Sequence, residues 1–192
     1  MAREFELKYQ ATPEKIRAIR EKYGSFTPIT METTYYDTPD RDFGRRHWTL
    51  RRRLENGISV CTLKTPLPDG SRGEWETCCE HITESILELC KLGAPEALAD
   101  LAKKGLAPSC GAAFTRLAAK LELDGCTVEL ALDEGFLLGG GNKLPLAEVE
   151  VELKAGSEIL AVAFAKALSR EFDLTPEPKS KIQRALALAD AG

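Results

Sequence analysis

The stretch EFELK, residues 4–8, places a charged side chain at every second position near the start of the chain. Because successive side chains of a β-strand point to opposite faces, the two acids and the lysine would lie on one face, and Phe5 and Leu7 on the other. A strand with one charged and one apolar face is typical of an antiparallel sheet packed on one side only. The fold therefore depends on which face of the sheet is enclosed.

Six later segments alternate in the same way and are bounded by turn residues, among them Asn56-Gly57 and Asp124-Gly125. Three of these segments follow one another closely, which predicts a meander of antiparallel strands. The run of glycines at 139–141 separates two others and is interpreted as a hairpin turn. The six predicted strands are residues 47–55, 58–65, 73–80, 114–123, 127–135 and 146–154.

Apolar residues at helical spacing predict helices between these strands. Thr12 is a suitable N-cap for the first helix, Pro13 suits its first turn, and Gly24 is a suitable stop. A helical stretch at 83–106 interrupts the strand pattern and is interpreted as an insertion. Two more helices are expected at residues 157–172 and 179–190.

Length and composition favour one compact domain over residues 1–192 that contains this insertion. The chain is 43% hydrophobic and 29% charged, which is typical of a globular protein and unlike a disordered one. A net charge of −4 argues against a broad electrostatic surface for nucleic acid.

No apolar stretch approaches the roughly 20 residues that a membrane-crossing helix needs, and no membrane partner is expected. The six cysteines form no C-x-x-C pair and follow no secretory signal, so we expect reduced and mostly buried thiols and a cytoplasmic location.

The distribution of charge indicates that the charged face is the enclosed one. A sheet with a wetted polar face explains the alternation in any single strand. It does not explain why Arg51, Arg53 and Lys64 occupy two neighbouring strands while acid pairs occupy others. We therefore expect the sheet to curl into a bore, with its charged face inside and its apolar face outside under helices.

The side chains expected in this bore nearly balance in charge. Clustered carboxylates raise one another's pKa unless cations neutralise them, and oxygen ligands suit Mg²⁺ or Mn²⁺. Fixed bases in turn require an anion, and a polyphosphate chelated to a divalent metal meets both needs. The expected acids are Glu4, Glu6, Glu74, Glu76, Asp133, Glu148 and Glu150, and the expected bases are Lys8, Arg51, Arg53, Lys64, Arg116 and Lys181.

These motifs resemble, in order, the CYTH domain of the triphosphate tunnel metalloenzymes. The opening E-x-E-x-K is that family's signature, and the likeness extends over nearly the whole chain. The other matching motifs are YYDTP at 35–39, LRRR at 50–53, TLK at 62–64, E-x-E at 74–76, EVEVEL at 148–153 and SK at 180–181. The resemblance implies an α+β fold in which an eight-stranded antiparallel β-barrel forms a tunnel with a charged interior, flanked by helices.

The resemblance also implies roles for individual residues. Glu4, Glu6, Glu148 and Glu150 would bind the metal, Mg²⁺ or Mn²⁺. Lys8, Arg51, Arg53, Lys64, Arg116 and Lys181 would bind phosphates. Glu74, Glu76 and Asp133 would support the lining, and Arg52 would face the other way.

The leading functional interpretation is a metal-dependent hydrolase that cleaves the terminal phosphoanhydride of inorganic triphosphate. Glu4 or Glu6 would orient the attacking water and Lys8 would assist at the reacting phosphate. Alternatives are a thiamine triphosphatase, an adenylyl cyclase of class IV and, less favoured, a non-catalytic binder of polyphosphate or nucleotide. A triphosphate-containing small molecule is the expected partner, and a homodimer is possible.

Overall fold

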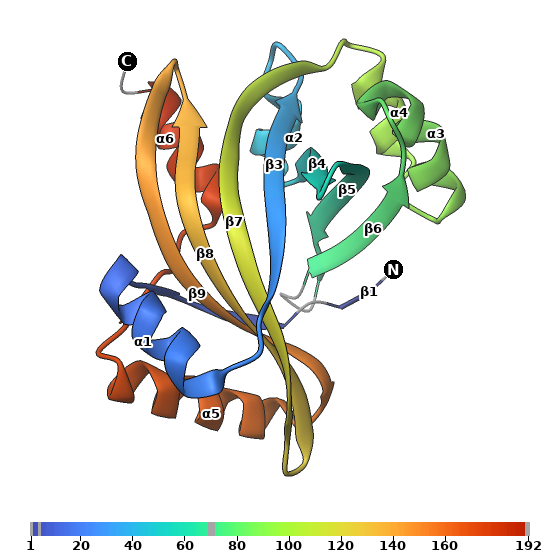
Figure 1. The fold of residues 1–192 in the computed structure, drawn as a ribbon. Helices are drawn as coiled ribbons and strands as arrows, with labels where there is room; N and C mark the ends of the chain where they lie inside the picture. Colours follow the sequence, from blue (N-terminus) through green and yellow to red (C-terminus); the bar gives the residue numbers. More distant parts are fainter. Residues whose placement is uncertain (1, 4, 69–71, 191–192) are drawn as a thin grey trace.

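The computed structural model describes residues 2, 3, 5–68 and 72–190, and a single curved antiparallel sheet dominates it (Figure 1). The described strands follow the order β1-β6-β5-β4-β3-β7-β8-β9-β2-β10. The strands are β1 (Ala2–Arg3), β2 (Glu6–Gln10), β3 (Thr27–Asp37), β4 (Thr49–Glu55), β5 (Ile58–Pro66), β6 (Arg72–Cys78), β7 (Ala107–Leu123), β8 (Cys126–Gly139), β9 (Asn142–Gly156) and β10 (Thr175–Pro176).

The predicted helices begin and end close to their expected bounds, and the short helix α2 (Asp42–Arg45) was not predicted. Thr12 caps the first helix by accepting a hydrogen bond from the backbone N of Lys15, and Gly24 follows its last turn with a positive φ of 76°. No helix among the described residues is long and apolar enough to cross a membrane. The helices are α1 (Pro13–Tyr23), α2 (Asp42–Arg45), α3 (Ile82–Lys91), α4 (Ala97–Ala102), α5 (Glu158–Glu171) and α6 (Lys181–Asp190).

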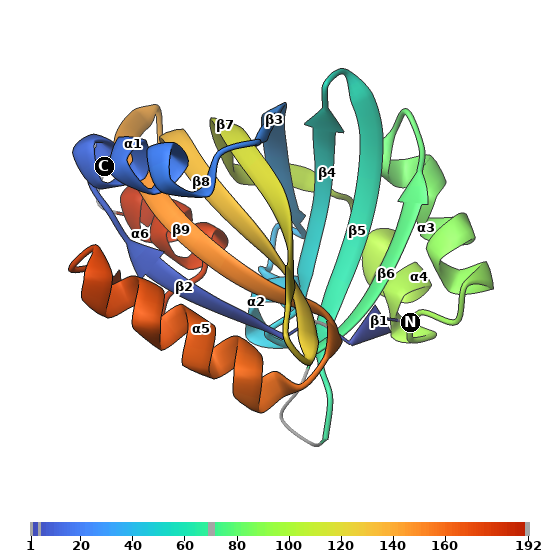
Figure 2. The ribbon, with the colours of Figure 1, turned by 60° about the horizontal axis from the view of Figure 1, so that its bottom comes forward.

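The helices cover the apolar face of the sheet, and this face is convex, as the charge pattern predicted. One apolar core joins Leu130 and Val149 of the sheet's convex face to Ile16 of α1 and Ala165 of α5. A second core joins Leu63 on the same face to α3 and α4. Figure 2 shows α1 and α5 outside the curve on one side and α3 and α4 outside it on the other. The charged side chains are left to the concave face.

The strand β3 was not among the strands predicted from alternation. Its concave face carries Ile29, Met31, Thr33 and Tyr35, so the charged face that marks the other strands is absent. Because β3 pairs with β4 and β7, it joins the meander to the long C-terminal strands. One wall of the interior therefore carries no charged side chain of β3.

The hydrogen-bonded barrel is not closed in the part of the chain that the structure describes. The order of strands ends at β1 on one side and β10 on the other. However, β1 pairs with β6 and β2 pairs with β9, so the N-terminal segment spans the two sides of the curve. The predicted α+β fold, an antiparallel sheet flanked by helices, is confirmed, whereas closure of the sheet into an eight-stranded barrel is not.

The last helix, α6, lies on the concave face at one end. Its Ala185 packs with Met31, Phe114 and Leu137 in a third, smaller core. The glycine turn after β8 makes this contact possible, since a Cβ on Gly139 would lie 2.2 Å from the carbonyl oxygen of Ala185. The glycines thus form the predicted hairpin turn and also leave room for the backbone of α6.

The six cysteines are free thiols, but fewer are buried than the sequence suggested. Cys61 and Cys126 are buried, Cys78 is exposed, and the other three are partly exposed. The expectation of mostly buried thiols is therefore wrong. Cys78 lies at the end of β6, where the alternation of the strand directs it away from the second core.

Replacing Leu130 by alanine should lower the free energy of unfolding by about 2–5 kcal/mol, because it empties a fully buried position under the helices. The adjacent Glu129 points to the opposite face, so Glu129→Ala should change this free energy by about 0.5 kcal/mol or less. Urea unfolding followed by circular dichroism measures both. Equal losses for the two variants would contradict an apolar convex face.

Candidate functional site

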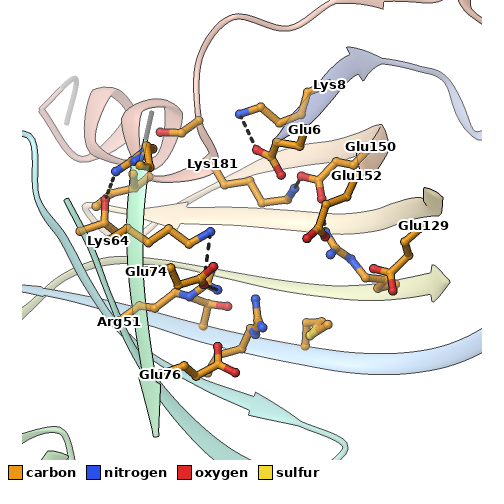
Figure 3. A pocket seen from close by; sticks show the side chains of 18 of the residues that line it. Glu6, Lys8, Arg51, Lys64, Glu74, Glu76, Glu129, Glu150, Glu152 and Lys181 are labelled. Carbon is orange, nitrogen blue, oxygen red and sulfur yellow. Dashed lines mark hydrogen bonds and ion pairs between the residues drawn. The ribbon is translucent and has the colours of Figure 1, made fainter. Parts of the chain in front are cut away.

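The concave face encloses a cavity of about 970 Å³ lined mainly by charged side chains. Figure 3 shows acids and bases from opposite sides of the curve pointing into it. Lys8 and Glu6 come from β2, whereas Arg51, Lys64 and Glu74 come from β4, β5 and β6. The cavity therefore collects residues from both ends of the chain, as the predicted bore requires.

A group of bases on β4 and β5, here called the basic wall, consists of Arg51, Arg53 and Lys64. All three line the cavity, with side chains 13–15% exposed. Arg51 and Arg53 are two residues apart on one strand and so share a face. Glu74 lies 3.9 Å from Arg51 and 3.5 Å from Lys64, and Glu55 pairs with Arg53.

The basic wall has hydrogen-bond donors without acceptors. The Nε atoms of Arg51 and Arg53 are buried and have no hydrogen-bond partner among the described residues. Burial and the nearby charge of Arg51 lower the pKa of Arg53, although the contact with Glu55 opposes this shift. Two buried guanidinium donors therefore lack acceptors here, and an anion in the cavity would supply them.

On the other side of the cavity, Asp133, Glu148 and Glu150 form an acidic triad. Asp133 and Glu148 are cross-strand partners on β8 and β9, and Glu150 lies two residues further along the same face. All three are buried, and Asp133 and Glu148 are fully so. Of the three, Glu150 lines the cavity, and the other two lie behind it.

The ammonium of Lys181, the first residue of α6, lies among these carboxylates. Its Nζ is 2.9 Å from Asp133 Oδ2 and 2.6 Å from Glu150 Oε1, and it also donates to Glu148. Burial opposes the charged form of Lys181, but the three acids raise its pKa above the ordinary value. Lys181 is thus fixed by carboxylates in this structure.

Two arginines complete the neutralisation of the triad. Arg116, on β7, donates from Nε and Nη2 to the two oxygens of Asp133, at 2.8 and 2.7 Å, and also to Glu150. Arg184, one turn after Lys181, donates to Glu148. The three carboxylates thus face three cationic side chains.

The carboxylates of the triad respond differently to this environment. Burial raises the pKa of Glu148, and Lys181 only partly offsets that shift. Burial acts in the same direction on Glu150, but Lys181 and Arg116 hold its pKa well below the usual range. Glu150 is therefore the carboxylate of this pair that stays ionised most firmly.

The donor chemistry of the triad suits a hard divalent cation. Each of its three residues offers an oxygen, and these oxygens lie within 4.8 Å of one another. Oxygen-only sets of this kind are typical of Mg²⁺ and related ions. Glu6 lines the same cavity, with its side chain 28% exposed and 3.6 Å from Lys8. Glu4, also predicted as a metal ligand, lies outside the described residues.

The structure brings the remaining predicted residues to the cavity in supporting positions. Glu74 pairs with Lys64, and Glu76 accepts a hydrogen bond of 3.1 Å from Thr62. Arg52 points outward, where it donates to Ser59 and to the carbonyl of Glu80. Its predicted orientation is confirmed.

Three residues of the site, Arg184, Arg72 and Tyr35, were not predicted from the sequence. Arg184 could have been found from its spacing, because it lies three residues after Lys181 on the same helix face. Arg72 lines the cavity and donates to Thr49 at 3.3 Å. Tyr35 is buried at the cavity wall, and burial raises the pKa of its hydroxyl.

The YYDTP motif contributes mainly to local structure. The carboxylate of Asp37 accepts hydrogen bonds from the backbone N atoms of Thr38, Phe43 and Gly44. It thereby shapes the turn that contains α2, and Tyr35 is the member of the motif that lines the cavity.

The model of the CYTH domain matches residues 2–186. The chain belongs to the CYTH family. An inorganic triphosphatase of Haemophilus influenzae is 27% identical over 195 residues, which cover 98% of this chain and 55% of the relative. The chain therefore spans about half the length of this curated relative.

Solved structures of similar proteins share the CYTH fold. The Hippeastrum protein HpAC1, described as an adenylyl cyclase candidate with a dominant triphosphatase activity, is 17% identical with a TM-score of 0.66, covering 98% of this chain and 96% of that one. The PH1819 protein of Pyrococcus horikoshii OT3 is 23% identical with a TM-score of 0.65, covering 96% and 99%. At these identities the likeness establishes the fold alone.

Replacing Arg184 by methionine should lower the free energy of unfolding by about 3 kcal/mol, because it leaves the fully buried Glu148 short of a cation. Arg41→Met is the matched control, since Arg41 also binds α6, through an exposed ion pair of 2.7 Å with Asp190. Exposed pairs contribute little, so the control should unfold like the wild type. Urea titration compares the three proteins, and similar midpoints for all would contradict a structural role for Arg184.

Proposed function

We propose that this protein hydrolyses a triphosphate, most favourably inorganic triphosphate, in a reaction that requires a divalent metal ion. The observation that carries the proposal is the basic wall, where buried arginine donors without acceptors face a cavity whose other side is acidic. An anion alone would satisfy the bases and a cation alone would satisfy the acids. A triphosphate chelated to a divalent cation satisfies both.

The basic wall would bind the phosphates together with Lys8. Two arginines on one strand present their guanidinium groups to the same side, which suits bidentate contacts to successive phosphates. Lysines act as point charges that tolerate a shift of the phosphate. Arg116 and Lys181 complete the predicted set of phosphate ligands, although in this structure both bind carboxylates.

The acids would hold the metal ion, with Glu148, Glu150 and Glu6 as ligands, Glu4 as a further one, and Asp133, Glu74 and Glu76 in support. We propose Mg²⁺ or Mn²⁺, since the donors are oxygens. When bound, such an ion polarises phosphate oxygens and neutralises charge that develops on them.

Hydrolysis needs a water in line with the terminal phosphorus. Glu6 lines the cavity beside Lys8, in a position to orient that water and to take its proton. As the new P–O bond forms, the bond to the bridging oxygen breaks, which yields orthophosphate and diphosphate. The bases would stabilise the charge on the transferring and leaving groups.

Two relatives support this assignment. The Haemophilus relative is named an inorganic triphosphatase, and the Hippeastrum protein is described with a dominant triphosphatase activity. We extend that reaction to this chain because its cavity provides both the bases and the acids that the reaction needs. A cytoplasmic location and a homodimer remain part of this proposal.

One assay separates the candidate functions. Purified protein is incubated with inorganic triphosphate, thiamine triphosphate or ATP, each with Mg²⁺ or Mn²⁺, and the products are resolved. Release of orthophosphate from inorganic triphosphate in preference to the others supports the proposal. Formation of cyclic AMP and diphosphate from ATP would instead indicate an adenylyl cyclase. A preference for thiamine triphosphate would indicate a thiamine triphosphatase, and binding without turnover would indicate a non-catalytic sensor.

Replacing Arg53 by alanine should reduce kcat/KM about a hundredfold, because loss of one donor to a developing oxyanion commonly costs about 3 kcal/mol. The control is Arg52→Ala, which removes the same charge one residue away on the outer face. Steady-state hydrolysis of triphosphate measures both. The proposal for Arg53 is wrong if the two variants lose activity equally.

A further inference from the structure

Lys181 occupies the place where a divalent cation would meet the acidic triad. Its ammonium contacts one oxygen of each carboxylate, Asp133, Glu148 and Glu150. A lysine ammonium has three donors, so these three contacts use all of them. In this arrangement Lys181 has no donor left for a phosphate.

Charge reinforces this conclusion. The triad already faces Lys181, Arg116 and Arg184, so its negative charge is balanced by side chains of the protein. A divalent ion bound next to the ammonium would place two cations among the same oxygens, where the low effective dielectric strengthens their repulsion. Metal binding at the triad and the observed position of Lys181 therefore exclude each other.

From this exclusion we propose that Lys181 is a displaceable counter-ion: it neutralises the acidic triad when no metal is bound, and an entering divalent cation transfers it to the phosphates of the substrate. The proposal rests on the proposed function, since it needs both ligands. It explains how one lysine can bind carboxylates in this structure and still belong to the phosphate-binding set.

The surroundings allow the side chain to move while the helix stays in place. Lys181 lines the cavity at the very start of α6, beside Ser180. The helix itself is anchored by Ala185, which is buried with Met31 and Phe114 in the third core. The ring of Phe114 also lines the cavity and makes a cation–π contact with the ammonium in its present position, 5.4 Å from Nζ. A rotation about the lysine side chain is therefore sufficient.

The exchange has a thermodynamic consequence. A metal ion that must displace Lys181 binds weakly by itself, because its binding breaks the ion pairs between the ammonium and the three carboxylates. Triphosphate gives the displaced ammonium a new partner and so recovers part of that loss. The two ligands should therefore strengthen each other's binding, and by linkage each should do so by the same factor.

Calorimetric titration of Mg²⁺ into wild-type protein and into Lys181→Met tests this exchange, with and without a methylene-bridged triphosphate analogue that cannot be hydrolysed. In the wild type, the analogue should tighten Mg²⁺ binding at least tenfold. Lys181→Met should bind Mg²⁺ alone at least tenfold more tightly than the wild type, and the analogue should add little. The control is Lys179→Met, which removes an exposed charge on the same segment and should behave like the wild type.

Equal or weaker Mg²⁺ binding by Lys181→Met would overturn the proposal. If that variant does not fold, a measurement on the wild-type protein still tests the exchange. Nitrogen-15 NMR of its lysine ammonium groups should show the Lys181 signal, assigned by its loss in Lys181→Arg, shifting as Mg²⁺ is added. A signal that stays unchanged at saturating Mg²⁺ overturns the exchange.

These measurements do not depend on hydrolysis. A protein that shows the exchange but fails to hydrolyse triphosphate would refute the proposed function alone. A protein that hydrolyses triphosphate without competition between Lys181 and Mg²⁺ would refute the exchange alone.

Discussion

Every carboxylate enclosed by the curved sheet needs a cation within reach, because a buried charge without a partner costs several kcal/mol. The concave face meets this requirement unevenly. Around Asp133, Glu148 and Glu150 the protein supplies the cations itself, from β7 and α6. On β4 the bases have acids beside them, but the buried Nε atoms of Arg51 and Arg53 have no acceptor among the described residues. These unsatisfied donors are the feature on which the proposed binding of an anion rests.

The convex face explains why such a costly interior is tolerated. Leu130, Val149 and their neighbours are buried against α1 and α5, and Leu63 and Trp75 are buried against α3 and α4. The helices at 82–102 thus have a packing role, since they cover the meander as α1 and α5 cover the long strands. Burial of apolar area on the outside offsets the electrostatic cost of the inside.

Much of the fold could be predicted because charged and apolar residues alternate in most strands. Such alternation indicates a β-strand with one charged face and one apolar face. The prediction missed β3, where Ile29, Met31 and Thr33 replace the charges and erase the signal. The residues that line the site could be predicted from the sequence, but the ion pairs between them could not. No pattern in the sequence shows that α6 folds onto β7–β9, so the contacts of Lys181 and Arg184 with Glu148 became visible only with the structure.

Neighbouring strands of this sheet can be very distant along the chain, as β2 pairs with β9. On a ribosome, β2 is synthesised long before its partner, and the apolar side of Leu7 and Tyr9 has nothing to pack against in the meantime. Contacts of such long range slow folding and expose intermediates to aggregation. A nascent chain of this protein should therefore depend on chaperones until β9 has emerged, and its cavity can form only when α6 follows.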